Sequence, residues 1–156
     1  MQLRIIDKIT LGYASAYLHD AVFQRGQIQH DSKAKTLTME VWRELWEQTI
    51  SERFLLIFYR WKTPYIRCRL TFENVSTCQT KFTDELEHYQ ILHLQFDPLN
   101  NEIKIAGVCC FEIKLKVGSL EGNVTDLEER TTESFNKTTI GLTKFNRANG
   151  TDRADR

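Results

Sequence analysis

The sequence has no surplus of charge of either sign, no long apolar run and no glycine-rich loop, and each absence excludes a class of function. Lys and Arg number 21 and Asp and Glu number 21, so no global field attracts nucleic acid or an anionic membrane. No segment approaches the roughly 18 apolar residues of a membrane span. The seven glycines are scattered and form neither phosphate-loop pattern, which excludes a P-loop nucleotide hydrolase.

Cysteine is sparse, and its spacing matches no known motif. Cys68, Cys78, Cys109 and Cys110 contain no C-x-x-C pair, so they predict neither a zinc site nor a redox motif. The first ten residues have no secretory apolar segment and no small-residue cleavage site. We therefore expect reduced thiols, a cytoplasmic location, no membrane partner, no metal and no cofactor.

Alternating hydrophobicity dominates what is present, within a length of 156 residues that suits one globular domain. Cys68, Leu70 and Phe72 fall on one face of a strand, with charged and polar residues between them. The same pattern predicts strands at residues 36–41 and 110–117, and further strands are expected at residues 21–29, 89–96 and 102–106. The apolar run at residues 54–59 predicts a central strand.

Helical periodicity is limited to three segments. Thr10 is expected to cap a short helix whose apolar positions include Leu11, Ala14 and Leu18. Residues 42–54 fit either an amphipathic helix or a continuation of the preceding strand. A third candidate, residues 120–129, is weakened by Gly122.

These patterns predict an α+β fold with a mostly antiparallel sheet, curled or barrel-like, and one or two short helices. Composition shifts to Thr, Asn and Arg after Glu129, so we expect one domain at residues 1–129 and a largely disordered, flexible tail at residues 130–156. The predicted core is Leu18, Val22, Ile28, Leu37, Met39, Val41, Leu56, Phe58, Leu70, Phe72, Leu92, Leu94, Phe96, Ile103, Ile105, Phe111, Ile113 and Leu115.

Two His-Asp pairs, His19-Asp20 and His30-Asp31, are typical of metal-dependent phosphohydrolases. If residues 21–29 form a strand, the two histidines lie about 36 Å apart, whereas ligands of one metal lie about 2 Å from it. Asp20 instead suits the end of the first helix, and Asp31 suits the first position of a hairpin turn. A metal-dependent hydrolase is therefore the least favoured function, and no catalytic residue is assigned.

One stretch combines basic and aromatic residues. Arg60, Trp61, Lys62, Arg67 and Arg69 lie in a segment free of acidic residues, and a hairpin turning at Thr63-Pro64 would place Arg60 opposite Arg67. Directly opposed like charges are destabilising unless an anion lies between them. That anion could be internal, from Glu73, Glu112 or the acidic residues of 44–52, or external, from a phosphate or nucleic acid. The neutral chain favours internal pairing, and these five residues remain the candidate ligand-binding set.

The segments "YLHDAVFQRGQIQHDSKAKTLTMEVWRE", "RCRLTFENV" and "FEIKLKVGSLEG" resemble a family of small bacterial proteins of unknown function. In that family a Leu-x-Asp-Ala helix end leads into a β-hairpin and a strand-rich body, and the likeness spans Leu11 to Gly122. The resemblance implies no activity, cofactor or catalytic set. We expect a non-catalytic binding or protein-interaction module with a protein partner, and binding of an anion or nucleic acid by the five basic and aromatic residues is the alternative.

Overall fold

The computed structural model describes residues 1–54, 58–107 and 111–131, and it describes residues 50–54 and 58–62 by their backbone alone. The described chain forms one α-helix, two short 3₁₀ helices and the strands β1 to β12. In chain order the elements are β1 (Gln2–Ile5), α1 (Lys8–Tyr17), β2 (Val22–Phe23), η1 (Arg25–Gln27), β3 (Ile28–Asp31), β4 (Thr36–Glu44), η2 (Trp46–Gln48), β5 (Ile50–Phe54), β6 (Phe58–Lys62), β7 (Tyr65–Phe72), β8 (Val75–Phe82), β9 (Tyr89–Asp97), β10 (Glu102–Gly107), β11 (Phe111–Val117) and β12 (Gly122–Thr131).

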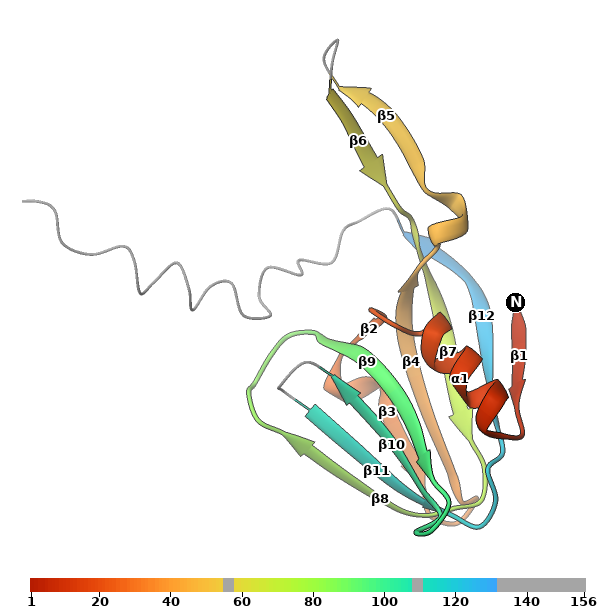
Figure 1. The fold of residues 1–156 in the computed structure, drawn as a ribbon. Helices are drawn as coiled ribbons and strands as arrows, with labels where there is room; N and C mark the ends of the chain where they lie inside the picture. Colours follow the sequence, from red (N-terminus) through yellow and green to blue (C-terminus); the bar gives the residue numbers. More distant parts are fainter. Residues whose placement is uncertain (55–57, 108–110, 132–156) are drawn as a thin grey trace, which may run out of the picture.

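Ten strands form one antiparallel sheet in the order β1-β12-β7-β4-β2-β9-β10-β11-β8, with β3 paired to β4 beside that path. The sheet curls around the core, and α1 lies across it between β1 and β9 (Figure 1). The predicted α+β class with a mostly antiparallel sheet is confirmed. The sheet is open: among the described strands, β1 and β8 lie at its two ends and do not pair with each other.

The predicted first helix is confirmed, but it begins earlier than expected. Asp7 is the N-cap: its carboxylate accepts the Thr10 backbone N–H at 2.8 Å, while the Thr10 hydroxyl accepts the Asp7 N–H at 3.1 Å. Thr10 is thus the third helical residue of a reciprocal capping box rather than the cap itself. Leu11 and Ala14 turn into the core.

The core lies inside the curl of the sheet and contains most of the residues that alternation predicts. The residues at inward positions of β4, β7, β10 and β11 are fully or almost fully buried. An aromatic cluster closes one end, with Phe23 edge-on to Phe111 at 5.0 Å and Phe82 edge-on to Tyr89 at 4.7 Å between ring centroids. Ile28 and Phe96 are partly buried, and the side chains of Leu56 and Phe58 lie outside the described part.

The prediction that Leu92 lies in the core is wrong. It is 37% exposed, and Ile91 is buried instead. The pairing of β9 with β10 shifts there, because Ala106 lies opposite His93 while Gly107 lies opposite Ile91. Leu92 is the extra residue of this bulge, and a bulge reverses the inward alternation along a strand.

Four predicted elements differ from the structure. Residues 21–29 are not one strand, because Gln24 and Gln27 close the turn η1 through reciprocal hydrogen bonds of 2.7 and 2.9 Å. The helical alternative for residues 42–54 is wrong, because β4 stays paired with β7 as far as Glu44, and such pairing overrides helix propensity. The third helix candidate is strand β12. Of the predicted central strand at residues 54–59, Phe54 ends β5 and residues 58–59 begin β6, and residues 55–57 lie outside the described residues.

The predicted turn at Thr63-Pro64 does not form a hairpin. β6 pairs with β5, whereas β7 pairs with β4 and β12, so Arg60 lies opposite Glu52 and not opposite Arg67. β12 continues to Thr131, and the remainder of the predicted tail, residues 132–156, lies outside the described residues. Within the described residues, no helix has the length and apolarity needed to cross a membrane.

Candidate functional site

The five predicted binding residues are divided between two parts of the molecule. Arg67 and Arg69 lie on β7 in the middle of the large sheet, whereas Arg60, Trp61 and Lys62 lie on β6 in the separate hairpin. The structure therefore does not bring them together as opposite strands of one hairpin.

Arg67 and Arg69 are both paired with carboxylates of the neighbouring strands. One Glu40 oxygen accepts a hydrogen bond from Arg69 Nη2 at 2.9 Å, and its other oxygen accepts one from Arg67. Arg67 also donates to Glu129 on β12. The hydrogen bonds from Arg69 and Arg67 lower the pKa of Glu40, which favours the ionised form of the carboxylate that both cations bind.

This pairing supports the internal alternative for the two arginines on β7. The partners are Glu40 and Glu129 and not the acidic residues expected from the sequence. Sequence reasoning missed Glu40 because its position opposite Arg69 depends on the register between β4 and β7. The surface of β7 therefore presents no unbalanced positive charge from these two residues.

The hairpin β5–β6 extends away from the ten-stranded sheet (Figure 1). Its two strands pair with each other along five positions, from Ile50 opposite Lys62 to Phe54 opposite Phe58. Two contacts close its base: Leu45 N–H donates to Pro64 O at 2.8 Å, and the hydroxyls of Thr49 and Thr63 lie 2.9 Å apart. The hairpin therefore leaves the body as a ribbon with a fixed base.

The two His-Asp pairs occupy separate local structures. His19 Nδ1 lies 3.3 Å from Asp20 Oδ2, and Asp20 also accepts a hydrogen bond from Gln90. Asp31 Oδ1 accepts the backbone N–H groups of Lys33 and Ala34, each at 2.9 Å, which confirms the predicted turn-starting role of Asp31. Across the described ranges, no three His, Cys, Asp or Glu side chains lie close enough together to hold a metal ion.

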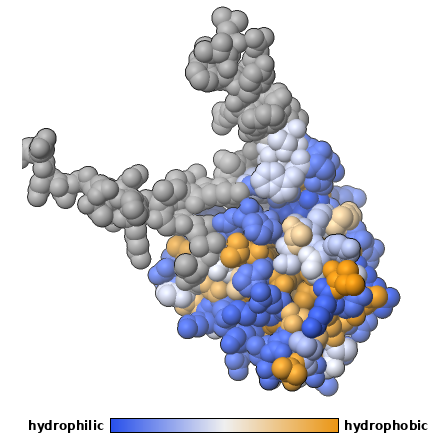
Figure 2. Space-filling view, in the orientation of Figure 1, coloured by the Kyte–Doolittle hydropathy of each residue, from blue (hydrophilic) through white to orange (hydrophobic). Residues whose placement is uncertain are grey.

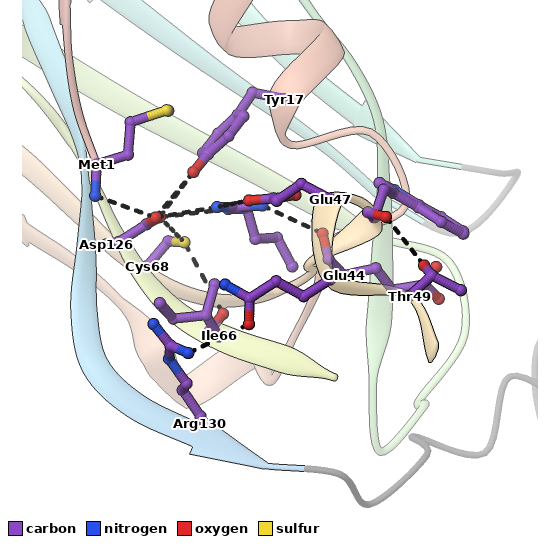
Figure 3. A network of polar contacts seen from close by, with 12 residues as sticks. Met1, Tyr17, Glu44, Glu47, Thr49, Ile66, Cys68, Asp126 and Arg130 are labelled. Atoms are coloured by element: carbon purple, nitrogen blue, oxygen red, sulfur yellow. Dashed lines mark hydrogen bonds and ion pairs between the residues drawn. The ribbon is translucent and has the colours of Figure 1, made fainter. Parts of the chain in front are cut away.

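A buried polar network that sequence reasoning missed lies where α1, β4, β7 and β12 meet (Figure 3). Its centre is the Asp126 carboxylate, whose side chain is 9% exposed. Arg43 donates to it from Nε at 3.2 Å and Nη2 at 2.9 Å, Tyr17 donates its hydroxyl at 2.9 Å, and Cys68 Sγ lies at 2.9 Å. The N-terminal ammonium of Met1 completes the shell at 3.2 Å.

Arg43 is itself almost fully buried, with 3% of its side chain exposed. Its guanidinium stacks over the Tyr17 ring at 3.8 Å and donates to Glu47 and to the carbonyl of Glu44, each at 3.2 Å. Burial alone would disfavour the charged forms of Arg43 and Asp126, but each has hydrogen-bond partners for its charged group.

The network holds the Asp126 carboxyl, the Cys68 thiol and the Tyr17 phenol each in one protonation state at neutral pH. Burial by itself raises the pKa of Asp126, but the hydrogen bonds from Arg43, Cys68 and Tyr17 outweigh it and lower that pKa. Burial and the Asp126 hydrogen bond raise the pKa of the Cys68 thiol and of the Tyr17 phenol. Because the thiolate is the reactive form of cysteine, the arrangement suits a structural anchor and not a nucleophile.

A sequence signal for this network existed in the strand alternation. Arg43 continues the inward series of Met39 and Val41 on β4, and Asp126 continues that of Val124 on β12. Opposite charges at inward positions of two strands predict a buried pair, since lone buried charges are very costly. Which strands are neighbours cannot be read from the alternation, so the partners could not be assigned.

The fold and this site define a class of protein: an open, curled antiparallel sheet with one covering helix, pinned by a buried ion pair and carrying a projecting two-stranded ribbon. The chain belongs to the family described as "Protein of unknown function (DUF2948)", whose family model matches residues 1–138. This confirms the resemblance to a family of unknown function. No curated protein sequence and no solved structure matches the chain.

Proposed function

We propose that this protein is a non-catalytic protein-interaction module that binds a partner protein through the β5–β6 hairpin. The observation that carries the proposal is the isolation of that hairpin, whose described strands pair with each other and not with the ten-stranded sheet. A two-stranded ribbon alone is only marginally stable in water. Such a ribbon gains stability when a partner covers it, and its unpaired strand edges suit strand addition.

The composition of the hairpin favours a protein partner. Its strands carry Tyr59 and Trp61 together with Arg53, Arg60 and Lys62, against one acidic residue, Glu52. Tyr, Trp and Arg are enriched among the residues that dominate protein-binding energy. The partner surface should therefore be acidic with apolar pockets.

The pairing of Arg67 and Arg69 disfavours the nucleic-acid alternative. Nucleic acid binding depends on several cations that neutralise phosphates along a continuous surface. On β7 both arginines already bind Glu40 or Glu129, so they add nothing to the positive charge of the hairpin. The proposal places the module in the bacterial cytoplasm, which suits its free cysteines Cys68 and Cys78.

The experiment compares the full chain with a variant in which a short Gly-Ser linker replaces residues 50–62. Thr49 and Thr63 are suitable ends, because their hydroxyls lie 2.9 Å apart. A photo-reactive phenylalanine analogue at position 61 of the full chain captures the partner in cells, with the same analogue at the exposed Tyr13 on α1 as control. The captured protein is then purified, and its affinity for the full chain and for the excised variant is measured.

We expect saturable binding to the full chain, at least about 100-fold weaker binding to the excised variant, and the same thermal transition for both proteins. Equal binding of the two proteins, or no capture at position 61 above that at position 13, would overturn the proposal. Binding of an oligonucleotide that falls steeply with salt and requires the hairpin would replace it with the anion alternative. Dimerisation of the pure protein that is lost on excision would make a second copy the occupant and would also overturn it.

A further inference from the structure

The outward side of α1 is apolar. At about 3.6 residues per turn, Ile9, Gly12, Tyr13 and Ala16 lie together on the side of the helix opposite the one that enters the core. All four are exposed, Ile9 at 67% and Tyr13 at 63%, and these four residues form the α1 face. Lys8 is the only charged residue in the helix. A surface helix normally carries charged residues on its outward side, whereas a helix that is apolar all round is normally covered.

The exposed apolar side chains of the molecule concentrate around this face. Seven large hydrophobic side chains are exposed in the part of the chain that the structure describes, and four of them, Met1, Ile6, Ile9 and Tyr13, belong to the first thirteen residues. Figure 2 shows hydrophobic side chains over the start of α1. Single exposed apolar residues are normal, but a gathering of them marks an interaction surface.

Gly12 is not explained by packing within one chain. Glycine destabilises a helix interior relative to alanine, and packing accounts for it where a side chain would clash. At Gly107 and Gly122 an added Cβ would come within 2.2 and 2.4 Å of backbone oxygens, whereas at Gly12 it would meet nothing within 4 Å. Gly12 therefore leaves a shallow space on the α1 face that no described part of the chain fills.

The α1 face is complementary to itself. Its two large residues, Ile9 and Tyr13, and its two small residues, Gly12 and Ala16, are placed symmetrically about the point between residues 12 and 13. A two-fold axis at that point makes two helices antiparallel and sets Ile9 opposite Ala16 of a second copy and Tyr13 opposite its Gly12, because the rise per residue is constant at about 1.5 Å. Each large side chain then meets a small one, and the symmetry repeats every contact.

The charges at the ends of the helix favour the same arrangement. Lys8 begins α1, and Asp20 follows its end with a side chain that is one-third exposed. Antiparallel packing brings the Lys8 ammonium group toward the Asp20 carboxylate of the second copy. It also sets the positive end of each helix dipole beside the negative end of the other.

We propose that the protein forms a weak homodimer in which the α1 faces of two copies pack antiparallel about a two-fold axis. Tyr13 of each copy occupies the space beside Gly12 of the other. One helix face with its rim buries on the order of 1,000 Å² in total, which is the size of a weak, reversible interface. The face is separate from the β5–β6 hairpin, so this dimer does not depend on the proposed function.

The test is sedimentation equilibrium of the full chain from about 5 to 500 μM, a range that detects micromolar association. Ile9→Glu adds an acidic residue to the first helical turn and Ala16→Lys adds a basic residue to the last turn, which both suit the helix dipole. Gly12→Leu fills the space beside Gly12 with a better helix former. Leu99→Glu is the matched control, because Leu99 is 93% exposed in the turn between β9 and β10.

We expect the unaltered protein and Leu99→Glu to dimerise equally, and Ile9→Glu, Ala16→Lys and Gly12→Leu to dimerise at least about tenfold more weakly. An equimolar mixture of Ile9→Glu and Ala16→Lys should form a heterodimer, because antiparallel packing sets the introduced carboxylate opposite the introduced ammonium group. Excision of residues 50–62 should leave the dimer intact. A photo-crosslink from position 13 to a second copy is distinguished by its mass from capture of another protein.

A protein that stays monomeric at about 500 μM would overturn the proposal. Dimerisation that is unchanged in Ile9→Glu and Gly12→Leu, equally weakened in Leu99→Glu, or lost on excision of the hairpin would place the interface elsewhere and also overturn it. Failure of the mixture to form a heterodimer would rule out the antiparallel arrangement. The thermal transition of each variant checks separately that it is folded.

Discussion

Replacing Asp126 by asparagine should be among the most destabilising single changes that keep side-chain size. Asp126 receives two hydrogen bonds from Arg43 and one each from Tyr17 and Cys68, and both ions are more than nine-tenths buried. Removing one partner of a buried ion pair costs about 3 to 5 kcal/mol, because the other charge stays buried and uncompensated. In Asp126→Asn, Arg43 still has the exposed Glu47 and the carbonyl of Glu44 as hydrogen-bond acceptors. We therefore expect a loss of unfolding free energy at the lower end of this range, about 3 kcal/mol.

Circular dichroism at pH 7 measures both the unfolding free energy, from a urea titration, and the melting temperature, from a thermal scan. For a chain of this size, about 3 kcal/mol lowers the melting temperature by roughly 6 to 12 °C. Glu40→Gln is the matched control, since it removes a carboxylate from the more exposed pairs with Arg67 and Arg69, and such pairs contribute about 1 kcal/mol or less. Equal losses for Asp126→Asn and Glu40→Gln would refute the assignment of the network as an anchor.

A double-mutant cycle isolates the pair itself. Arg43→Met combined with Asp126→Asn leaves neither charge unpaired, so its loss should be smaller than the sum of the single losses by at least about 1.5 kcal/mol. Strict additivity would show that the two groups do not stabilise each other.

The same network predicts the sign of a pH effect. The folded-state pKa of Asp126 lies below its ordinary value of 3.8, so the stability that it contributes is complete above about pH 4 to 5 and is lost as the pH falls toward the lowered pKa. The difference in unfolding free energy between the unaltered protein and Asp126→Asn should therefore shrink below pH 4. A difference that grows on acidification would contradict the assigned direction.

Two further predictions concern single residues, Gly12 and Cys68. Gly12→Ala should stabilise the protein by about 0.5 to 1 kcal/mol in thermal unfolding, because alanine is the better helix former and its methyl group meets open space there. A destabilised variant would mean that the space beside Gly12 is not open. Cys68 should be alkylated by iodoacetamide at pH 8 much more slowly than the partly exposed Cys78, because burial and Asp126 raise the pKa of its thiol. Site-resolved mass spectrometry measures both rates, and faster labelling of Cys68 would contradict the buried network.

The sequence predicts the strands well where one face is buried and alternation is uninterrupted. Met39 on β4 and Leu70 on β7 are examples, and register pairs them directly. It fails at Leu92, where a bulge reverses the alternation, because the extra residue of a bulge is defined by the partner strand and leaves little local signal. It also fails at residues 42–54, whose helical spacing is real but is overridden by the pairing of β4 with β7.

The candidate sites show the same division between local and long-range information. The turn role of Asp31 depends on residues two and three positions away, so its sequence context predicts it. The partner of Arg69 depends on which strand lies beside β7, and the partners of Asp126 come from four separate parts of the chain. Such pairings between distant parts of the chain depend on the topology of the whole sheet, which cannot be read from a single sequence.

The buried network and the projecting hairpin are physically connected, which bears on how the hairpin would bind. Glu47 of η2 binds the buried Arg43, and the neighbouring Gln48 accepts a hydrogen bond from Arg130 on β12 at 3.2 Å. The next residue, Thr49, contacts Thr63 and leads into β5. The base of the hairpin is thus held by both β4 and β12. A ribbon that leaves a fixed base loses less orientational freedom on binding than one on a free linker, so more of its contact energy remains as affinity. If the hairpin binds a partner as proposed, Asp126→Asn should weaken that binding as well as stability, because Asp126 holds Arg43, and Arg43 binds Glu47 at the base of the hairpin.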